Sequence, residues 1–371
     1  MVKRDRRGSF GMRRVRWWWV GGGLVVVMAV VGVGGAVVYA RLDGNITPDE
    51  AAAAELARLE RERPSALVKG AQNVLLIGSD SRAGEGNSAY GRDSGSERAD
   101  SMILLHLAAG RRSATAVSLP RDLMVEVPAC LRGDGTRTEP SLAMLNHAFQ
   151  VGGSACAIRT VEELTGIRVD HHVVVDFQGF KEMVDAVDGV QVCLAKAVDD
   201  RAAKLRLPAG KVKLNGEQAL GFVRARKSLG DGSDTDRMDR QQRFLAALVD
   251  KVWSNGVLLN PVKLYPVLDA ATSSVTADPE LAGLRGMYEL VRGLREIPTD
   301  RVQFLTVPRE SYVYNTNRDQ LVQPAAGKLF GRLRADLPVT VASAPQSYGH
   351  GVRTPPTPTY RGSTATPQRC E

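Results

Sequence analysis

The chain has 371 residues, a formal net charge of +8, four cysteines and an aromatic content of 5%. Seven of its basic side chains lie in the first sixteen residues, where only Asp5 opposes them, so the remainder is close to neutral. This distribution excludes a strongly basic folded domain, and with it most of the support for nucleic-acid binding.

The N-terminal region is predicted to be a membrane anchor. A basic stretch over 1–16 precedes three consecutive tryptophans and an uncharged Val- and Gly-rich run from Val20 to Ala40. About 20 apolar residues span a bilayer as a helix, so we expect one transmembrane helix over 17–40. A cleaved signal peptide is the alternative, because Val38-Tyr39-Ala40 resembles a cleavage site. The positive-inside rule places 1–16 in the cytoplasm and the chain from residue 41 outside the cell membrane.

The segments on either side of the main domain are predicted from composition. Residues 41–66 are expected to form a solvated helical stalk, because 48–63 are rich in Ala, Glu and Arg and end at Pro64. Residues 343–371 are rich in Pro, Thr, Ser and Gly and are expected to be disordered. The stretch 67–342 is long enough for one domain with a single core.

Within this domain, short apolar runs alternate with amphipathic segments. Buried strands are expected at NVLLIG, MILLHLA, ATAVSL, HVVVDF and VQVCLA. Helices are expected over 141–151, 157–165, 177–187 and 237–253, and LNGEQALGFV is expected to run from a helix into a strand. The fold class is therefore α/β or α+β, with a mixed sheet.

Cysteines outside the cytoplasm can form disulfides. Cys130 and Cys156 flank a polar loop and a helical segment, and closing a loop of roughly 27 residues stabilises a fold by about 3 kcal/mol. We therefore expect this bridge. Cys193 lies in a strand-like run and is expected to be buried, Cys370 lies in the tail, and their pairing is left open.

Two carboxylates are candidate metal ligands. Asp80 follows the first apolar strand, and Asp100 stands at the head of the next, with Arg98 on the same face because strand side chains alternate. If these strands are neighbours, both carboxylates can reach one Mg²⁺, which also takes phosphate oxygens. Arg82 and the Gly- and Ser-rich loop 83–97 lie between them.

Arginines at the ends of other elements are candidate phosphate ligands. Arg121 directly follows a strand and is next to Asp122, so a turn-fixing ion pair and substrate contact are equally weighted interpretations. Arg224 and Arg226 are one residue apart in an expected extended run and would share a face, which favours an anion between them.

The helix over 237–253 extends the candidate site. Arg237 and Gln241 are four residues apart near its start, Arg240 lies on a neighbouring face, and Asp234 or Asp236 would cap it. Its apolar side is interpreted first as core, and second as part of a lipid groove formed by Phe244, Leu248, Trp253, Val257, Leu258, Leu259 and Leu264.

Other catalytic classes lack their motifs. No GxSxG elbow or Walker loop occurs, and His171 and His172 are adjacent rather than at metal-ligand spacing. His147 is interpreted as a structural hydrogen-bonding residue.

The chain resembles the LytR-CpsA-Psr family of bacterial envelope proteins. The matching segments follow the family's order over about residues 72–250: NVLLIGSDSR, RADSM, SLPRD, LNHAFQVGG, TVEELTGIRVDHHVVVDFQGF, LPAGKVKLNGEQALGFVRAR and DTDRMDRQQRFL. The chain departs from the family's pattern in two places. The spacing from Asp80 to Asp100 is longer than expected for the family, and Ser101 stands where the family usually has threonine.

The resemblance implies an α/β/α sandwich around a mixed sheet and a Mg²⁺-dependent phosphotransferase. Such an enzyme moves a glycopolymer from a polyprenyl pyrophosphate in the membrane to a peptidoglycan hydroxyl. By motif position, Asp80 and Asp100 would bind Mg²⁺, and the pyrophosphate would be held by Arg98, Arg121, Arg224, Arg226, Arg237 and Gln241. Second candidates are Arg82, Asp122, Asp234 and Arg240. A polyprenyl-pyrophosphate hydrolase and a non-catalytic lipid-phosphate binder or regulator are the alternative functions.

Overall fold

The computed structural model describes residues 40–79, 99–201, 203–225, 234–254, 269–270, 272–273, 275–342 and 358–366. The predicted transmembrane segment therefore lies outside the described residues except for Ala40. Within the described part of the chain, no helix is long and apolar enough to cross a membrane.

A nine-stranded mixed sheet among the described residues forms the centre of the molecule, in the order β1-β12-β7-β2-β3-β4-β13-β17-β16. Its middle confirms the predicted apolar runs, which become β2 (Gln72–Ser79), β3 (Ala99–Leu107), β4 (Ala114–Leu119) and β7 (His171–Val175). The other strands are β1 (Thr47–Pro48), β12 (Val275–Ala277), β13 (Val302–Thr306), β16 (Thr340–Ala342) and β17 (Thr359–Thr364).

Strand direction brings several strand ends to one edge of this sheet. β2 is parallel to β7, β4 is parallel to β13, and β3 runs antiparallel between β2 and β4. The C-terminal ends of β7, β2, β4 and β13 and the N-terminal end of β3 therefore lie together. We call this the carboxyl edge.

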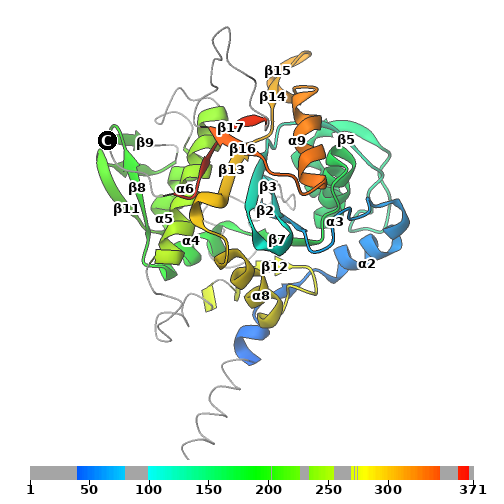
Figure 1. Ribbon diagram of the computed structural model, residues 1–371, viewed down its shortest axis with the longest axis horizontal. Coiled ribbons are helices and arrows are strands. Elements are labelled where there is room, and N and C mark those ends of the chain that lie inside the picture. The colour runs from blue at the N-terminus through cyan, green and yellow to red at the C-terminus, as the bar shows by residue number, and fades with distance from the viewer. Residues whose placement is uncertain are drawn as a thin grey trace, which may run out of the picture.

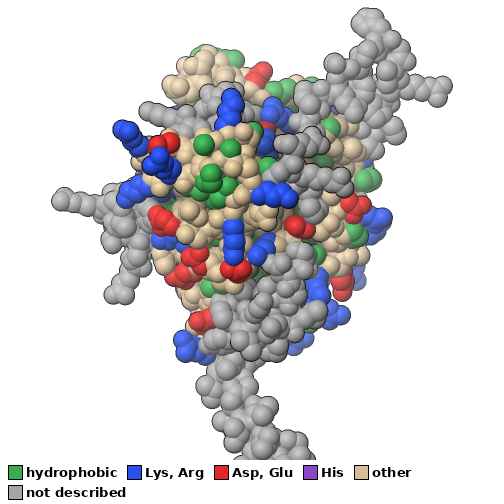
Figure 2. All heavy atoms as spheres, turned by 90° about the vertical axis from the view of Figure 1, so that its left-hand side faces the viewer, with side chains coloured by type: hydrophobic (Ala, Val, Ile, Leu, Met, Phe, Trp, Pro, Cys, Tyr) green, Lys and Arg blue, Asp and Glu red, His purple; other side chains and the backbone are tan. Residues whose placement is uncertain are grey.

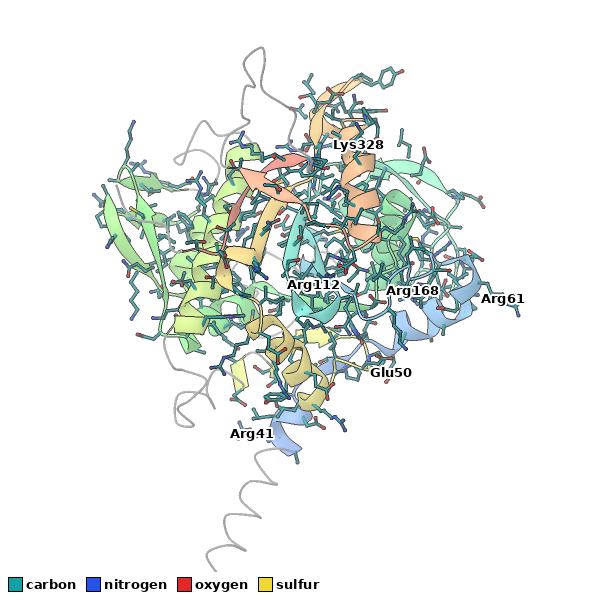
Figure 3. The ribbon with its side chains drawn as sticks, viewed as in Figure 1. Arg41, Glu50, Arg61, Arg112, Arg168 and Lys328 are labelled. Carbon is teal, nitrogen blue, oxygen red and sulfur yellow. A yellow bond between two sulfur atoms is a disulfide. The ribbon has the colours of Figure 1, made fainter. Side chains whose placement is uncertain are left out.

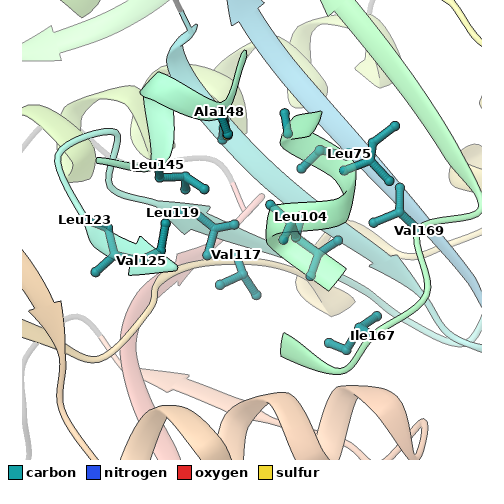
Figure 4. Close-up of a cluster of buried hydrophobic side chains, with 14 of the residues drawn as sticks. Leu75, Leu104, Val117, Leu119, Leu123, Val125, Leu145, Ala148, Ile167 and Val169 are labelled. Atoms are coloured by element: carbon teal, nitrogen blue, oxygen red, sulfur yellow. The ribbon is translucent and has the colours of Figure 1, made fainter. Parts of the chain in front are cut away.

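Helices cover both faces of the sheet, which confirms the predicted layers (Figure 1). On one face lie α2 (Glu50–Arg58), α3 (Leu145–Thr165) and α9 (Ala325–Arg334), and on the other α6 (Asp234–Ser254) and α8 (Leu284–Arg295). Figure 4 shows the first of these cores, where Leu75, Leu104 and Val117 of the sheet meet Leu145 and Ala148 of α3. Burial of these aliphatic side chains is the main stabilising contribution.

A third apolar cluster lies beside the sheet. It joins α4 (Phe177–Ala186), α5 (Gly216–Arg224) and Phe244 of α6 to two small antiparallel sheets. These pair β8 (Val190–Leu194) with β11 (Gly210–Leu214), and β9 (Val198–Asp200) with β10 (Leu205–Leu207). Basic and acidic side chains are interspersed on this side of the molecule (Figure 2).

The predicted stalk is instead part of the domain. Ala52 and Leu56 of α2 are buried in the core, and Glu55, only 7% exposed, is ion-paired with Arg58 and Arg137. Arg63 donates to both carboxylate oxygens of the buried Glu162 on α3. The composition of this segment is that of a solvated helix, but one face carries the small and apolar residues that pack against α3.

Around these contacts the segment keeps an exposed side. Arg61, in the single 3-10 turn that follows α2 (Glu60–Glu62), points away from the domain in Figure 3, whereas Arg168 reaches back to Glu60 at 2.8 Å.

The C-terminal residues also depart from the prediction. The tail was expected to be disordered, but Thr359–Thr364 form β17, which pairs with β13 and β16, and Tyr360 is buried. Strand pairing uses backbone hydrogen bonds, so a polar composition does not prevent it. The rest of the tail, 343–357 and 367–371, lies outside the described residues.

Two element boundaries differ from the sequence prediction. The helix expected from 141 begins at Leu145, because Ser141–Met144 form β6, which pairs with β5 (Met124–Val127). The strand expected after LNGEQAL is absent from the described residues, since α5 continues to Arg224.

The expected disulfide joins Cys130 to Cys156, with the Cα atoms 5.5 Å apart. α3 breaks where it passes the bridge: a Cβ on Gly152 would lie 2.7 Å from the Cβ of Cys156, and Gly153 has a φ of 60°. Cys193 was expected to be buried, but it lies exposed on β8 and is itself disulfide-bonded, to a partner outside the described residues.

Replacing both Cys130 and Cys156 by serine should lower the free energy of unfolding by about 3 kcal/mol, because the unfolded chain gains the freedom of an open loop. Urea unfolding followed by circular dichroism measures this difference. Under reducing conditions the two proteins should unfold together. A difference below about 1 kcal/mol in oxidising buffer would contradict the expected contribution.

Candidate functional site

A pocket of about 360 Å³ opens at the carboxyl edge of the central sheet. It brings together five of the residues singled out from the sequence, although they come from four different elements and span positions 100 to 241. Its lining consists of Gly78, Asp100, Arg121, Val175, Asp176, Phe177, Phe180, Leu220, Val223, Arg224, Arg237 and Gln241.

The sheet contributes the acidic part of the pocket. β2 and β3 are hydrogen-bonded neighbours, as the metal-site prediction required, with Gly78 opposite Ser101 and a register shift at Ser79. Arg121 follows β4, and its Nη1 lies 2.5 Å from Oδ1 of Asp100. Its Nε lies 3.5 Å from Oδ2 of Asp122. Arg121 therefore forms the expected ion pair with Asp122 and also lines the pocket, so the two interpretations do not exclude each other.

Helices α5 and α6 contribute the remaining basic part. Arg224 ends α5 and is exposed, with its guanidinium carbon 4.6 Å from the ring centre of Phe177. A cation over an aromatic face is held in place without losing its charge. Arg237 is 7% exposed and lines the pocket from α6, one helical turn before Gln241. The amide of Gln241 donates to the carbonyl of Val223 at 3.2 Å, which joins α6 to α5.

Arg240, predicted as a substrate ligand, does not line the pocket. Its guanidinium donates to the carbonyl of Ala225 and lies 6.0 Å from the ring of Phe222. A basic side chain at the C-terminal end of a helix satisfies carbonyls that have no partner within the helix. The role indicated for Arg240 is therefore to hold the end of α5, beside Arg224.

The apolar wall of the pocket comes from β7, α4 and α5, whereas the second interpretation of the sequence placed part of such a wall on the helix over 237–253. It is formed by Val175, Phe177, Phe180, Leu220 and Val223. Phe244, assigned first to the core and second to a groove, is fully buried, with its ring 5.5 Å from Phe180 and 6.4 Å from Phe222. The core interpretation is confirmed. Val257, Leu258, Leu259 and Leu264 lie outside the described residues.

Sequence reasoning missed Asp176, Phe177 and Phe180. Asp176 caps α4, and its carboxylate accepts a hydrogen bond from the backbone N–H of Gly179 at 2.7 Å. The signal was present in VVVDFQGF, a polar residue directly after an apolar strand, because ligands of open α/β sheets bind beyond the carboxyl ends of strands.

Several candidate residues lie outside the described part of the chain. These are Asp80, Arg82, Arg98 and Arg226, and the side chain of Asp234. Asp80 directly follows Ser79, which pairs with Ala99, the neighbour of Asp100. Carboxylate and phosphate oxygens are the donors that Mg²⁺ prefers, so the residue types at this edge fit the ion. Among the described residues, no group of three or more His, Cys, Asp or Glu could hold a metal.

The adjacent histidines lie at the opposite edge of the sheet and have structural partners. His172 Nε2 lies 3.1 Å from Asp49, and His171 Nδ1 lies 3.2 Å from Asp278. Burial alone would lower the pKa of His171, but the hydrogen bond and charge of Asp278 outweigh it and raise that pKa. These pairs connect β7 to α2 and β12, away from the pocket.

Comparison with known proteins agrees with the resemblance read from the motifs. Residues 44–334 match the model of the LytR_cpsA_psr family. A probable cell wall biosynthesis protein LcpB of Corynebacterium glutamicum is 38% identical over 210 residues, which are 55% of this chain and 47% of that protein. The cell wall biosynthesis protein LcpA of the same organism is 34% identical over 64% of this chain and 50% of its own length. The chain thus spans about half the length of these relatives.

More distant relatives have solved structures. The polyisoprenyl-teichoic acid–peptidoglycan teichoic acid transferase TagV of Bacillus subtilis is 26% identical over 81% of this chain and 73% of that protein. A crystal structure of B. subtilis TagV superimposes with a TM-score of 0.56, covering 73% of this chain and 98% of that chain at 25% identity. TagT bound to LI-WTA, at 24% identity and a TM-score of 0.54 over 74% of this chain and 96% of that one, shows the same fold.

Proposed function

The chain belongs to the LytR-CpsA-Psr family, and on that premise we propose that it is a phosphotransferase of cell-wall assembly. Its donor would be a glycopolymer on a polyprenyl pyrophosphate, its acceptor a hydroxyl of peptidoglycan, and its second product polyprenyl phosphate. The named transferase activity of TagV, which is similar in sequence, supports this proposal.

One observation carries the proposal: the pocket joins three guanidinium groups to an apolar wall. Arg121, Arg224 and Arg237 come from three different elements and line one hollow of about 360 Å³. Of the lining carboxylates, Asp100 is paired with Arg121 and Asp176 caps a helix. Arginine forks match phosphate oxygens, and a pyrophosphate carries enough negative charge to bring several of them together. The wall suits the first isoprene units.

The chemistry needs little more than position and charge neutralisation. The acceptor oxygen attacks the phosphorus that carries the glycopolymer, a new P–O bond forms, and the bond to the bridging oxygen breaks. The electron pair of that bond leaves with polyprenyl phosphate. The hydroxyl proton would pass to an aspartate carboxylate at the sheet edge that lines the pocket. The guanidinium groups stabilise charge that develops on the phosphate oxygens in the transition state.

We propose Mg²⁺ as the cofactor, held by Asp100 and Asp80. When bound, the ion would neutralise phosphate charge at the end of the pocket where Arg121 lies. Asp100 would then orient Arg121 through their ion pair as well as contribute an oxygen to the ion.

The proposed location is the outer face of the cell membrane. Residues 17–40 would anchor the chain with 1–16 in the cytoplasm, and the domain would meet its lipid-linked donor outside. The Cys130–Cys156 disulfide supports an oxidising compartment.

The test is a transfer assay with the full chain in detergent, a polyprenyl-pyrophosphate-linked glycopolymer and peptidoglycan oligomers. We expect polymer covalently attached to peptidoglycan and release of polyprenyl phosphate. Release of the lipid phosphate without attached polymer would favour the hydrolase alternative. Donor binding without either product would favour the non-catalytic binder.

Val223→Asn should weaken donor binding, because a polar amide would face the isoprene units in the wall. We expect the KM for a long-chain donor to rise about 10-fold, while a donor analogue with a very short chain is affected less. Val192→Asn is the matched control, since Val192 is a half-buried valine of the same apolar cluster that does not line the pocket. Equal effects of both substitutions would argue against the wall as the lipid site.

A further inference from the structure

A β-hairpin lies near the Arg121 end of the pocket. This is the end farthest from β7, the strand that carries Val175 of the apolar wall. Along the carboxyl edge, the lining runs from Val175 on β7 through Asp100 on β3 to Arg121 after β4. The next strand is β13, and the chain leaves it to form β14 (Arg309–Tyr312) and β15 (Asn315–Leu321). Figure 1 shows this hairpin projecting from one end of the molecule, with α8 at the opposite end.

The base of the hairpin is fastened to the segment that carries Arg121. Asp319 donates its backbone N–H to the carbonyl of Asp122 at 3.2 Å, and it forms a β-bridge with Leu123. Its carboxylate is ion-paired with Arg309, both being nearly buried. Arg318 lies 3.8 Å from the carboxylate of Asp122, which also contacts Arg121. The hairpin therefore has a fixed position relative to Arg121 and the sheet side of the pocket.

The tip of the hairpin exposes large apolar side chains. Val313 and Tyr314 occupy the two-residue turn and are 70% and 86% exposed. Glycine, proline and small polar residues are usual at such turns, so local folding does not require these side chains. The ring of Tyr314 lies 5.4 Å from that of Tyr312 in an edge-to-face arrangement, which gives the tip a defined aromatic surface.

Polar side chains of the hairpin are held by hydrogen bonds within it. Gln320 donates to Glu310 across the strands at 2.9 Å, and the amide oxygen of Asn315 accepts from the backbone of Asn317 at 3.0 Å. Tyrosine rings beside amides and carboxylates match a carbohydrate: the rings contact the C–H faces of pyranoses, and the polar groups hydrogen-bond the hydroxyls.

We propose that this hairpin binds the glycan strand of the peptidoglycan acceptor and presents its hydroxyl to the pocket. The inference rests on the proposed function and assigns it an acceptor subsite. Arg318 follows the turn on β15 and lies 3.8 Å from Asp122, which contacts Arg121, so the glycan would approach along the hairpin from its tip towards Arg121.

The in-line geometry of phosphoryl transfer indicates that the hairpin binds the acceptor glycan rather than the glycan of the donor. The attacking and leaving oxygens lie roughly in line on opposite sides of the phosphorus. The leaving group is the polyprenyl phosphate, whose chain lies along the wall that begins at Val175 and Phe177. The attacking hydroxyl must then come from the opposite direction, which is the side of Arg121 and the hairpin.

The test compares the full-length double variant Tyr312→Ala/Tyr314→Ala with wild type. The matched control is Tyr288→Ala, because Tyr288 is 62% exposed on the distant helix α8. Binding of a fluorescent, lipid-free peptidoglycan oligomer without donor should weaken at least 10-fold in the double variant and stay unchanged in the control. In the transfer assay, the KM for acceptor should rise at least 10-fold. The KM for donor, the rate at saturating acceptor and the unfolding temperature should remain at wild-type values.

The outcomes separate this inference from the proposed function. Wild-type glycan binding in the double variant would overturn the acceptor subsite and leave the phosphotransferase proposal standing. A rise in the KM for donor with an unchanged KM for acceptor would also overturn it, because the hairpin would then serve the donor glycan. Tyrosine-dependent glycan binding in a wild-type protein that transfers no polymer would support the subsite and refute the phosphotransferase.

Discussion

Replacing Arg224 by alanine should lower the rate of polymer transfer by about 10²–10³-fold while leaving the fold intact. The side chain lines the pocket and is exposed, so its removal costs little packing. Its contact with the ring of Phe177, another lining residue, at 4.6 Å positions the guanidinium in the pocket. The loss should therefore be in stabilisation of phosphate charge in the transition state.

Kinetics and thermal unfolding of the same preparations test this expectation. Arg285→Ala is the matched control, since Arg285 is an arginine on α8 whose side chain is 84% exposed. Arg224→Lys should recover part of the activity, because lysine keeps the charge but not the planar fork. Transfer at the wild-type rate in Arg224→Ala would remove this residue from the anion site.

Asp100→Asn should abolish most of the transfer and remove its response to Mg²⁺. The substitution preserves shape but takes away a carboxylate that pairs with Arg121 and is a proposed ligand of the ion. Both partners are partly exposed, with side-chain exposures of 30% and 21%, so the effect on folding should stay below about 1 kcal/mol. We expect a fall in rate of at least about 10²-fold.

Titration of the transfer rate with Mg²⁺ separates the metal role from the ion-pair role. Asp300→Asn controls for the loss of a carboxylate, because Asp300 is exposed just before β13, at the edge opposite the pocket. Calorimetry of Mg²⁺ binding to wild type and variant gives a readout that does not depend on turnover. A wild-type Mg²⁺ titration curve in Asp100→Asn would mean that the carboxylate only orients Arg121.

The side chains that line the pocket do not distinguish one donor glycopolymer from another. Under this proposal the pocket would recognise features shared by all polyprenyl pyrophosphates, namely two phosphates and an apolar chain. The sugar residues beyond them would contact other surfaces. Assays with donors that share a lipid but differ in glycopolymer would therefore map selectivity outside the pocket.

Local pattern predicted the strands well because a buried strand has a strong signature. The runs that became β2, β3 and β4 are short, β-branched and apolar, and all three lie in the centre of the sheet. The same reasoning failed for α5, where Phe222 and Val223 resemble a strand but complete a helix that packs against α6. Short apolar segments do not distinguish the two states, so the tertiary partner decides.

Composition alone misjudged both ends of the domain. Residues around Leu56 have the average polarity of a solvated helix, and those around Tyr360 that of a disordered tail. Each nevertheless buries a few side chains against an existing surface, α3 in one case and β13 in the other. The average polarity of a segment does not show that two or three of its apolar side chains can pack against the rest of the domain.

Residue types and their order along the chain determined which groups this protein offers for chemistry: arginines and aspartates at the ends of apolar runs, which are types that suit phosphate and a hard cation. Which of them act together was decided by the fold. Strand direction places Asp100 and Arg121 at one edge, and packing of α4 and α5 supplies the apolar wall there, whereas Arg240 is turned onto the end of a helix. The physical reason is that side-chain chemistry is a local property, while convergence depends on the direction and order of strands that pair over long distances in sequence.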